Sequence, residues 1–220
     1  VFAGYSEGFQ GLVAAFGVTD PKPEESRAFD AGVRFTAPIP GLSGTAAIYK
    51  IERENVVTGD PANPFASIQT GEQRAQGFEL DLVYEPTPAL SLLASYAYTD
   101  VEVTRDNVLP VGDRPARVPE HSVRLAGRYR IFDGALAGLE VGAGLTYTGE
   151  RFLTLPNGVK ADALTLVDAQ AEYDFGPVSL SVSVVNLFDE EAFEPFAYLD
   201  RAVVIPTQPR SAFVTLRTSF

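Results

Sequence analysis

Side chains that could carry out covalent chemistry are scarce in this chain. Its 220 residues include no Cys and one His, so a disulfide framework and a thiolate metal site are excluded. A metal site would have to be built from carboxylates. The single His, His121, has no nucleophile beside it in the sequence, and a structural role for it is favoured. We therefore predict no catalytic residue, no metal ligand and no cofactor.

Ligand binding is the chemistry that the sequence can better support. The acidic and aromatic stretch 189–200 could form a substrate-facing or calcium-binding loop, but a solvated loop whose aromatic rings pack locally is the favoured interpretation. Aromatic side chains in the expected loops would offer flat platforms to a planar or apolar chelate. The candidate ligand contacts are Tyr5, Phe9, Phe16, Phe65, Phe196 and Tyr198.

The elements that must position these side chains are β-strands. Between Ser122 and Phe132, apolar residues alternate with polar ones that include Arg124, Arg128 and Arg130. Because a strand sends successive side chains to opposite faces, this segment has one apolar and one polar flank. The pattern recurs along the chain and leaves no room for a helix of normal length. The expected strands are 1–6, 26–36, 44–55, 74–85, 90–103, 121–132, 139–150, 164–175, 178–188 and 210–220.

The connections between these strands alternate in length. Four are tight and rich in Pro and Gly, which favour turns: 37–43, 86–88, 133–138 and 176–177. Five are long: 8–25, 56–73, 104–120, 151–163 and 189–209. In an up-and-down antiparallel barrel, alternate connections share a rim, so strict alternation predicts one rim of short turns and one of long loops.

The distribution of side chains favours lipid over a protein core around the apolar flank. Ala, Leu and Val dominate the middle of the apolar flanks, and tyrosines lie near the strand ends, as interfacial aromatic girdles require. Charged side chains on the polar flank suit a wide aqueous lumen. The alternative is a large soluble β protein with a solvated outer face. The tyrosines concerned are Tyr84, Tyr98, Tyr129, Tyr147 and Tyr173.

The net charge excludes some classes of partner, and the first residues suggest that the chain belongs to a longer protein. The net charge of −12 argues against nucleic acid as a partner and against docking on anionic lipid headgroups. No run of about 18 apolar residues is present, so no transmembrane helix is predicted. Because position 1 already resembles the interior of a strand and no initiator Met precedes it, we expect residues 1–220 to be the C-terminal part of a longer protein.

Several local phrases carry a resemblance to a known family. They include the stretch from Gly71 to Leu80, in which Gly77 and Glu79 stand at motif positions, and the stretch from Ala94 to Asp100. They also include Asn186-Leu187-Phe188-Asp189 near the end and the terminal Phe220. In their shared order and spacing they resemble the C-terminal barrel region of TonB-dependent outer-membrane receptors, in particular the ferric-siderophore receptors.

The resemblance implies a fold and a function. The fold is an all-β, antiparallel, up-and-down transmembrane barrel of about 22 strands, of which this chain supplies about ten, with an N-terminal plug outside this chain. The function is active uptake of a ferric siderophore without covalent chemistry. Implied partners are the TonB complex, outer-membrane lipid and the barrel-assembly machinery, which would read Phe220. The alternatives are a receptor for haem, cobalamin or a glycan, a passive porin, and an outer-membrane barrel enzyme.

Overall fold

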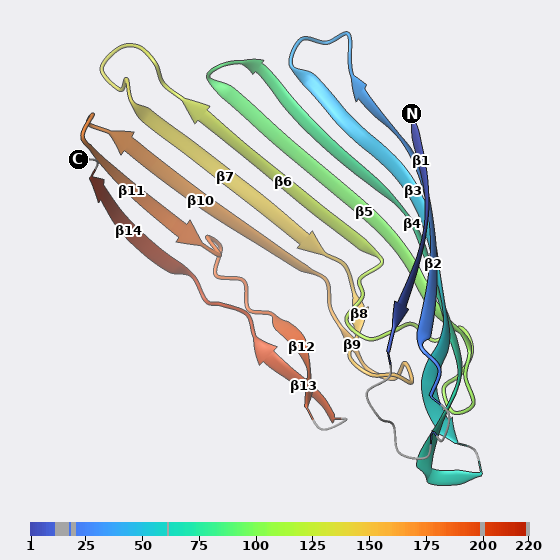
Figure 1. The fold of residues 1–220 in the computed structure, drawn as a ribbon. Coiled ribbons are helices and arrows are strands. Elements are labelled where there is room, and N and C mark those ends of the chain that lie inside the picture. The colour runs from blue at the N-terminus through green and yellow to red at the C-terminus, as the bar shows by residue number, and fades with distance from the viewer. Residues whose placement is uncertain (12–17, 19–20, 61, 199–200, 219–220) are drawn as a thin grey trace.

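The computed structural model describes residues 1–11, 18, 21–60, 62–198 and 201–218, and β-strands make up nearly all of its regular structure (Figure 1). No helix among these residues is long and apolar enough to cross a membrane. Ten strands form one sheet, in which every neighbouring pair is antiparallel. In order across the sheet they are β1 (Phe2–Gln10), β2 (Glu24–Thr36), β3 (Leu42–Asp60), β4 (Asn63–Thr87), β5 (Leu90–Arg105), β6 (His121–Arg130), β7 (Leu139–Thr148), β10 (Leu164–Asp174), β11 (Val178–Val185) and β14 (Ser211–Thr218).

The ten predicted strands and their up-and-down order are confirmed, but two of the expected long loops contain further strands. Two short pairs lie within them: β8 (Arg151–Phe152) with β9 (Lys160–Ala161), and β12 (Phe193–Tyr198) with β13 (Arg201–Pro206). The expected loop 56–73 is wrong, because β3 and β4 continue through it as one long hairpin. Asn55 at φ 59° accompanies a register shift between Arg53 and Val56, beyond which the two strands pair again.

The predicted separation of the connections onto two rims is confirmed, with the long β3–β4 hairpin in place of the expected loop 56–73. The short turns 37–41, 88–89, 131–138 and 175–177 lie along one edge of the sheet, and the long connections lie along the other (Figure 1). In the first turn Gly41 has φ 80°, and a Cβ there would lie 2.0 Å from the Glu85 carbonyl oxygen. Only glycine fits so close an approach of two turns, which explains its place at this rim.

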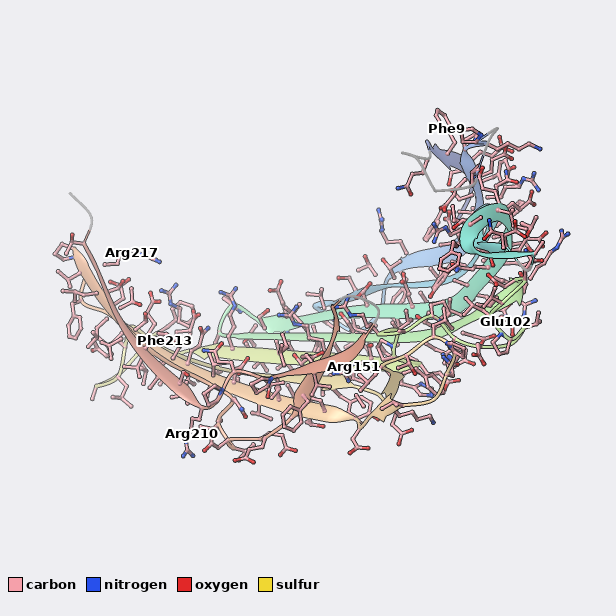
Figure 2. All side chains as sticks on the ribbon, turned by 90° about the horizontal axis from the view of Figure 1, so that it is seen from below. Phe9, Glu102, Arg151, Arg210, Phe213 and Arg217 are labelled. Carbon is pink, nitrogen blue, oxygen red and sulfur yellow. The ribbon has the colours of Figure 1, made fainter. Side chains whose placement is uncertain are left out.

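The apolar flank of the sheet has no second layer over it among the described residues. Figure 2 shows the sheet bent into an open trough, with Arg217 of the polar flank projecting from its concave side. On the opposite, convex flank Leu125 is 45% exposed and Val214 is 70% exposed. The few buried hydrophobic side chains of the described residues all lie toward the rim of long connections: Val101, Val103, Ala161 and Leu164. A soluble sandwich would bury the convex flank, so this part of the chain does not form one.

Aromatic side chains border the apolar flank at both ends, as predicted. Tyr129 lies opposite Leu90 near the short turns, and Tyr98 lies opposite Phe78 near the long connections. From Leu90 to Tyr98 on β5 the apolar run advances by eight residue steps, or about 27 Å at ~3.4 Å per step. A strand tilt of about 40° reduces this to about 21 Å across the membrane, close to the ~25 Å apolar band of such barrels.

A row of alternating charges ends the apolar flank on the side of the long connections. Five residues in successive strands are cross-strand partners along this row: Glu7, Arg27, Glu52, Arg74 and Glu102. Arg74 pairs with Glu102 at 2.5 Å, and Arg27 pairs with Glu54 at 3.0 Å. Charged side chains are costly in hydrocarbon, so contact with lipid tails has to end before this row.

Candidate functional site

The candidate site is the rim formed by the long connections, called the mouth here. Hydrogen bonds join the 11–23 connection to the β3–β4 hairpin and the hairpin to the 106–120 connection. The 11–23 connection meets the β3–β4 hairpin where the Lys22 amide donates to Gln69 Oε1 at 2.8 Å and Gln69 Nε2 donates to the Lys22 carbonyl at 2.7 Å. The hairpin meets the 106–120 connection where the Thr58 hydroxyl donates to Asp106 and the side-chain Nδ2 of Asn107 donates to the Thr70 hydroxyl.

Asp106 organises the start of the 106–120 connection. Its Oδ1 accepts hydrogen bonds from the Val108 amide at 2.8 Å and the Leu109 amide at 2.9 Å, in addition to the one from Thr58. Partial burial opposes ionisation of this carboxyl, but the hydrogen bonds from Leu109, Thr58 and Val108 outweigh it. The pKa of Asp106 is therefore held below its ordinary value. The charged carboxylate thus fixes this turn against the hairpin.

The concave wall below the mouth is polar and hollowed. Arg128 and Arg130 both approach Glu140, at 3.9 and 3.8 Å, and the Ser95 hydroxyl donates to Asp81 at 2.7 Å. A hollow of about 410 Å³ opens over β6, β7 and β10. Its lining combines the polar side chains of Arg128, Asp168, Gln170 and Ser183 with small and apolar residues such as Gly142 and Leu93. The polar groups suit contact with water and match the wet lumen predicted for this flank.

The motif residue Gly77 makes room for an aromatic ring on the concave wall. A Cβ at this position would lie 2.6 Å from the Tyr49 hydroxyl and 2.1 Å from the Tyr98 carbonyl oxygen. The Tyr49 hydroxyl is 2.9 Å from Thr99 Oγ1, on the strand beyond Gly77. Tyr49 therefore spans three strands, and Gly77 is the position that lets it do so. The second motif residue of this stretch, Glu79, is exposed on the same concave flank.

The Asn186–Asp189 motif closes the base of the last long connection. Asn186 is 1% exposed with φ 52°, and its Nδ2 donates to the carbonyls of Glu190 and Gln208 at 3.0 Å each. Its Oδ1 accepts the Glu190 amide at 2.8 Å, and Asp189 Oδ1 accepts the Arg210 amide at 2.9 Å. The motif thus joins the end of β11 to the start of β14. Its other members differ in surroundings: the Leu187 amide donates to the Val167 carbonyl, whereas the Phe188 side chain is exposed.

The predicted ligand contacts are not gathered in one place. Phe9 was expected in the loop 8–25, which is wrong, because β1 continues to Gln10. Phe9 and Tyr5, which lies in the predicted strand 1–6, both face the convex flank of β1. The Tyr5 ring packs on Phe29 at 4.6 Å between centroids, so Tyr5 does not line the mouth. Phe65 lies near the tip of the β3–β4 hairpin and is 83% exposed.

The other predicted positions fall partly or wholly outside the described residues. Phe16 and Phe220 lie outside them, and so do the side chains of Phe196 and Tyr198, whose backbone belongs to β12. His121 lies between two tyrosines, with its Nδ1 3.0 Å from the Tyr96 hydroxyl. In the described part of the chain, no three His, Cys, Asp or Glu side chains are grouped so that they could hold a metal ion.

Sequence reasoning did not single out the residues that join the last three connections, among them Arg114, Arg151 and Asn157. Asn157 Oδ1 accepts the Arg114 amide at 2.6 Å, and Arg151 Nη2 lies 2.8 Å from Glu194 Oε2. The Pro156-Asn157-Gly158 triplet signals a turn, but nothing in its composition indicates a partner 43 residues away.

Comparison with known proteins identifies the family. The family model described as "TonB dependent receptor-like, beta-barrel" matches residues 1–187. The chain belongs to this family. TonB-dependent receptors are transport proteins of the bacterial outer membrane, which confirms the predicted family and location.

Individual receptors of the family are similar over most of this chain. The metal-pseudopaline receptor CntO of Pseudomonas aeruginosa is 36% identical over 200 residues, which cover 90% of this chain and 28% of the receptor. The ferrichrome outer membrane transporter/phage receptor of Escherichia coli K12 is 34% identical over 174 residues, covering 77% of this chain and 23% of the transporter. The chain therefore spans about a quarter of the curated relatives that it matches.

A solved structure agrees with the fold. The siderophore receptor PiuA from Acinetobacter baumannii superposes with a TM-score of 0.83 at 24% identity, covering 97% of this chain and 32% of the receptor. At this identity the likeness concerns the fold alone. It agrees with the reading of the ten-stranded sheet as part of the wall of a receptor barrel.

Proposed function

We propose that this chain acts in the TonB-dependent uptake of a ferric siderophore across the outer membrane. The observation that carries the proposal is the gathering of the long connections at one rim of a wall whose concave flank carries charged and hydroxyl side chains. Such a rim forms a mouth in which a bulky hydrophilic chelate can be held above a wet passage. The similarity to the ferrichrome transporter supports iron chelates as the ligand class.

The open sheet supports completion of the barrel by further strands and a plug. Among the described residues, β1 pairs with β2 alone and β14 with β11 alone, so both outer strands present unpaired backbone groups. Unpaired N–H and C=O groups in hydrocarbon cost several kcal/mol each, so a membrane barrel has no free edges. We therefore propose that residues 1–220 form one part of a larger barrel of about 22 strands. The TonB complex and the barrel-assembly machinery are its proposed partners.

Among the aromatic candidates, Phe65 is the proposed ligand contact that the geometry favours most. It lies at the distal end of the β3–β4 hairpin, which the 11–23 and 106–120 connections brace from either side. The backbone of Phe196 and Tyr198 lies in β12, in the last long connection, so both remain proposed contacts. We propose no covalent step, because His121 is held between Tyr96 and Tyr98 at the edge of the apolar flank.

A second candidate function is uptake of a metal in complex with pseudopaline. The observation that favours it is the 36% identity to CntO, whose name states that it is a metal-pseudopaline receptor. The two candidates share the mouth and the energy source and differ in the ligand. They can therefore be separated only by measuring uptake of each chelate.

The test is uptake by a strain that lacks the gene, measured with ferrichrome and with metal-loaded pseudopaline as separate radiolabelled substrates. Loss of ferric-siderophore uptake on deletion, restored by the gene on a plasmid, supports the first candidate, and loss of metal-pseudopaline uptake supports the second. A TonB-deficient strain is the control. Uptake through the protein that persists without TonB would instead identify a passive channel, and unchanged uptake of both substrates would contradict both candidates.

A further inference from the structure

The last three long connections are tied to one another by side-chain contacts of Asn157 and Arg151, beside a backbone hydrogen bond from the Arg117 amide to the Phe152 carbonyl at 2.8 Å. Asn157, in the 149–163 connection, accepts the Arg114 amide through Oδ1 at 2.6 Å and donates to the Arg114 carbonyl through Nδ2 at 2.7 Å. Its own amide donates to Asp113 Oδ2 at 2.8 Å. The Asn157 side chain thus pairs with one backbone residue of the 106–120 connection through both its donor and its acceptor, as a neighbouring strand would.

Arg151 makes the next link, from the 149–163 connection to the 186–210 connection. Its side chain is 2% exposed, and Nη2 lies 2.8 Å from Glu194 Oε2 and 3.5 Å from the Phe193 carbonyl. Among the described carboxylates, Glu194 is the one paired with this guanidinium. A buried cation is costly without its counter-charge, so the position of Arg151 depends on β12 staying in place.

Together with the links at Gln69 and Asp106, these contacts form an unbroken series around the rim. The 11–23 connection is joined to the hairpin, the hairpin to 106–120, 106–120 to 149–163, and 149–163 to 186–210. In Figure 1 the β3–β4 hairpin, the β8–β9 pair and the β12–β13 pair lie along the same edge of the sheet. Each connection borders the next, so local opening of one removes hydrogen-bond partners from its neighbour.

We propose that Asn157 and Arg151 are positioning residues that couple the long connections into one continuous wall of the mouth. Breaking the contacts of either residue destabilises the neighbouring connection as well as the connection that carries the residue. The coupling itself does not depend on the proposed function; only its consequence for ligand binding does. If the mouth holds a chelate, both residues act on affinity without touching it.

The test is amide hydrogen exchange, read by mass spectrometry, of the complete purified receptor in detergent without ligand. Asn157→Ala removes both side-chain bonds to Arg114, so exchange should accelerate about tenfold or more in 106–120 as well as in 149–163. Glu194→Gln should accelerate exchange in 149–163 as well as in 186–210. Asn63→Ala is the matched control, because the side-chain hydrogen bond that the described residues give Asn63 lies within its own hairpin, from the Phe65 amide to Asn63 Oδ1. Its effect should stay within that hairpin.

Acceleration confined to the mutated connection in both test variants would overturn the proposal. Asn157→Asp, which keeps the acceptor for the Arg114 amide but loses the donor, provides a milder variant should Asn157→Ala fail to fold. It should give an intermediate acceleration in 106–120, and an unchanged rate there would also contradict the coupling. Because no ligand is used, these results are independent of whether a ferric siderophore is the true substrate.

Discussion

Replacing Gly77 by Ala should destabilise the barrel wall far more than a Gly-to-Ala change usually does. The new Cβ would lie 2.1 Å from the Tyr98 carbonyl oxygen and 2.6 Å from the Tyr49 hydroxyl. The first contact is with backbone of the neighbouring strand β5, which cannot turn aside. The second requires the Tyr49 ring to move and to lose its hydrogen bond with Thr99.

The size of the effect follows from these two contacts. Overpacking of this kind costs about 1–3 kcal/mol, and the lost hydrogen bond adds about 1 kcal/mol. Gly77→Ala should therefore lower the free energy of unfolding by about 2–4 kcal/mol. Gly144→Ala is the matched control on the same concave flank, because its Cβ would meet its nearest neighbour at an ordinary 3.7 Å. Gly144→Ala should raise the free energy of unfolding by about 0.4–1 kcal/mol, because Ala reduces the conformational freedom of the unfolded chain.

Urea unfolding of the purified protein in detergent, followed by far-UV circular dichroism, measures both variants. The transition midpoint should fall for Gly77→Ala and stay constant or rise for Gly144→Ala, with the slope unchanged. Adding Gly77→Ala to a Tyr49→Ala variant separates the two contacts, because the ring is then already absent. The midpoint of the double variant should still fall below that of Tyr49→Ala, by the part of the loss that the Tyr98 backbone causes. An unchanged midpoint for Gly77→Ala, or equal midpoints for Tyr49→Ala and the double variant, would refute the assignment of the clash to the Tyr98 backbone.

Three other predictions test the flanks, the mouth and the motif near the end of the chain. Leu125→Arg on the convex flank should lower the free energy of unfolding in lipid by about 2–4 kcal/mol, whereas Ala126→Arg on the concave flank should be tolerated. Urea titrations in liposomes measure both variants, and equal effects would contradict the placement of the flanks. The depressed pKa of Asp106 adds stability above the unfolded-state value of about 3.9 that is lost as pH falls through the folded value. Protection of the 106–120 amides should therefore drop below about pH 4, and Asp106→Asn should abolish this dependence. Asn186→Ala should lower the free energy of unfolding by about 3 kcal/mol, because it removes side-chain hydrogen bonds and places Ala in a left-handed backbone conformation. Asn186→Gly avoids the backbone strain and should cost about 1 kcal/mol less. Unfolding midpoints measure both variants.

Strand pairing was predictable because its signal is local. Alternation with period two places Val123, Leu125 and Tyr129 on one flank, whatever lies beside them, and Pro and Gly mark the short turns. The hairpin beyond Asn55 was missed because Gly59, Asp60 and Pro61 look like loop residues. In the structure β3 and β4 remain paired as far as Asp60 and Asn63, so Gly59 and Asp60 lie within the hairpin and not in a loop.

The mouth could not be predicted in the same way, because its contacts join residues far apart in sequence. Arg151 sits in a polar stretch and would be expected in water, yet its side chain is 2% exposed against Glu194. Tyr5 shows the converse. Its aromatic character suggested ligand binding, but strand register turns it to the convex flank against Phe29.

The amino-acid pattern alone was sufficient for the two-faced strands, the separation of short and long connections, and the family resemblance. Each of these depends on neighbouring residues and on the period of a strand, which is written directly in the chain. Tertiary structure was needed for the burial of Arg151, the bond between Asn157 and Arg114, and the ring of Tyr49 over Gly77. Those contacts arise only when the sheet curves and its rim connections meet, and their geometry depends on distances that no local pattern encodes.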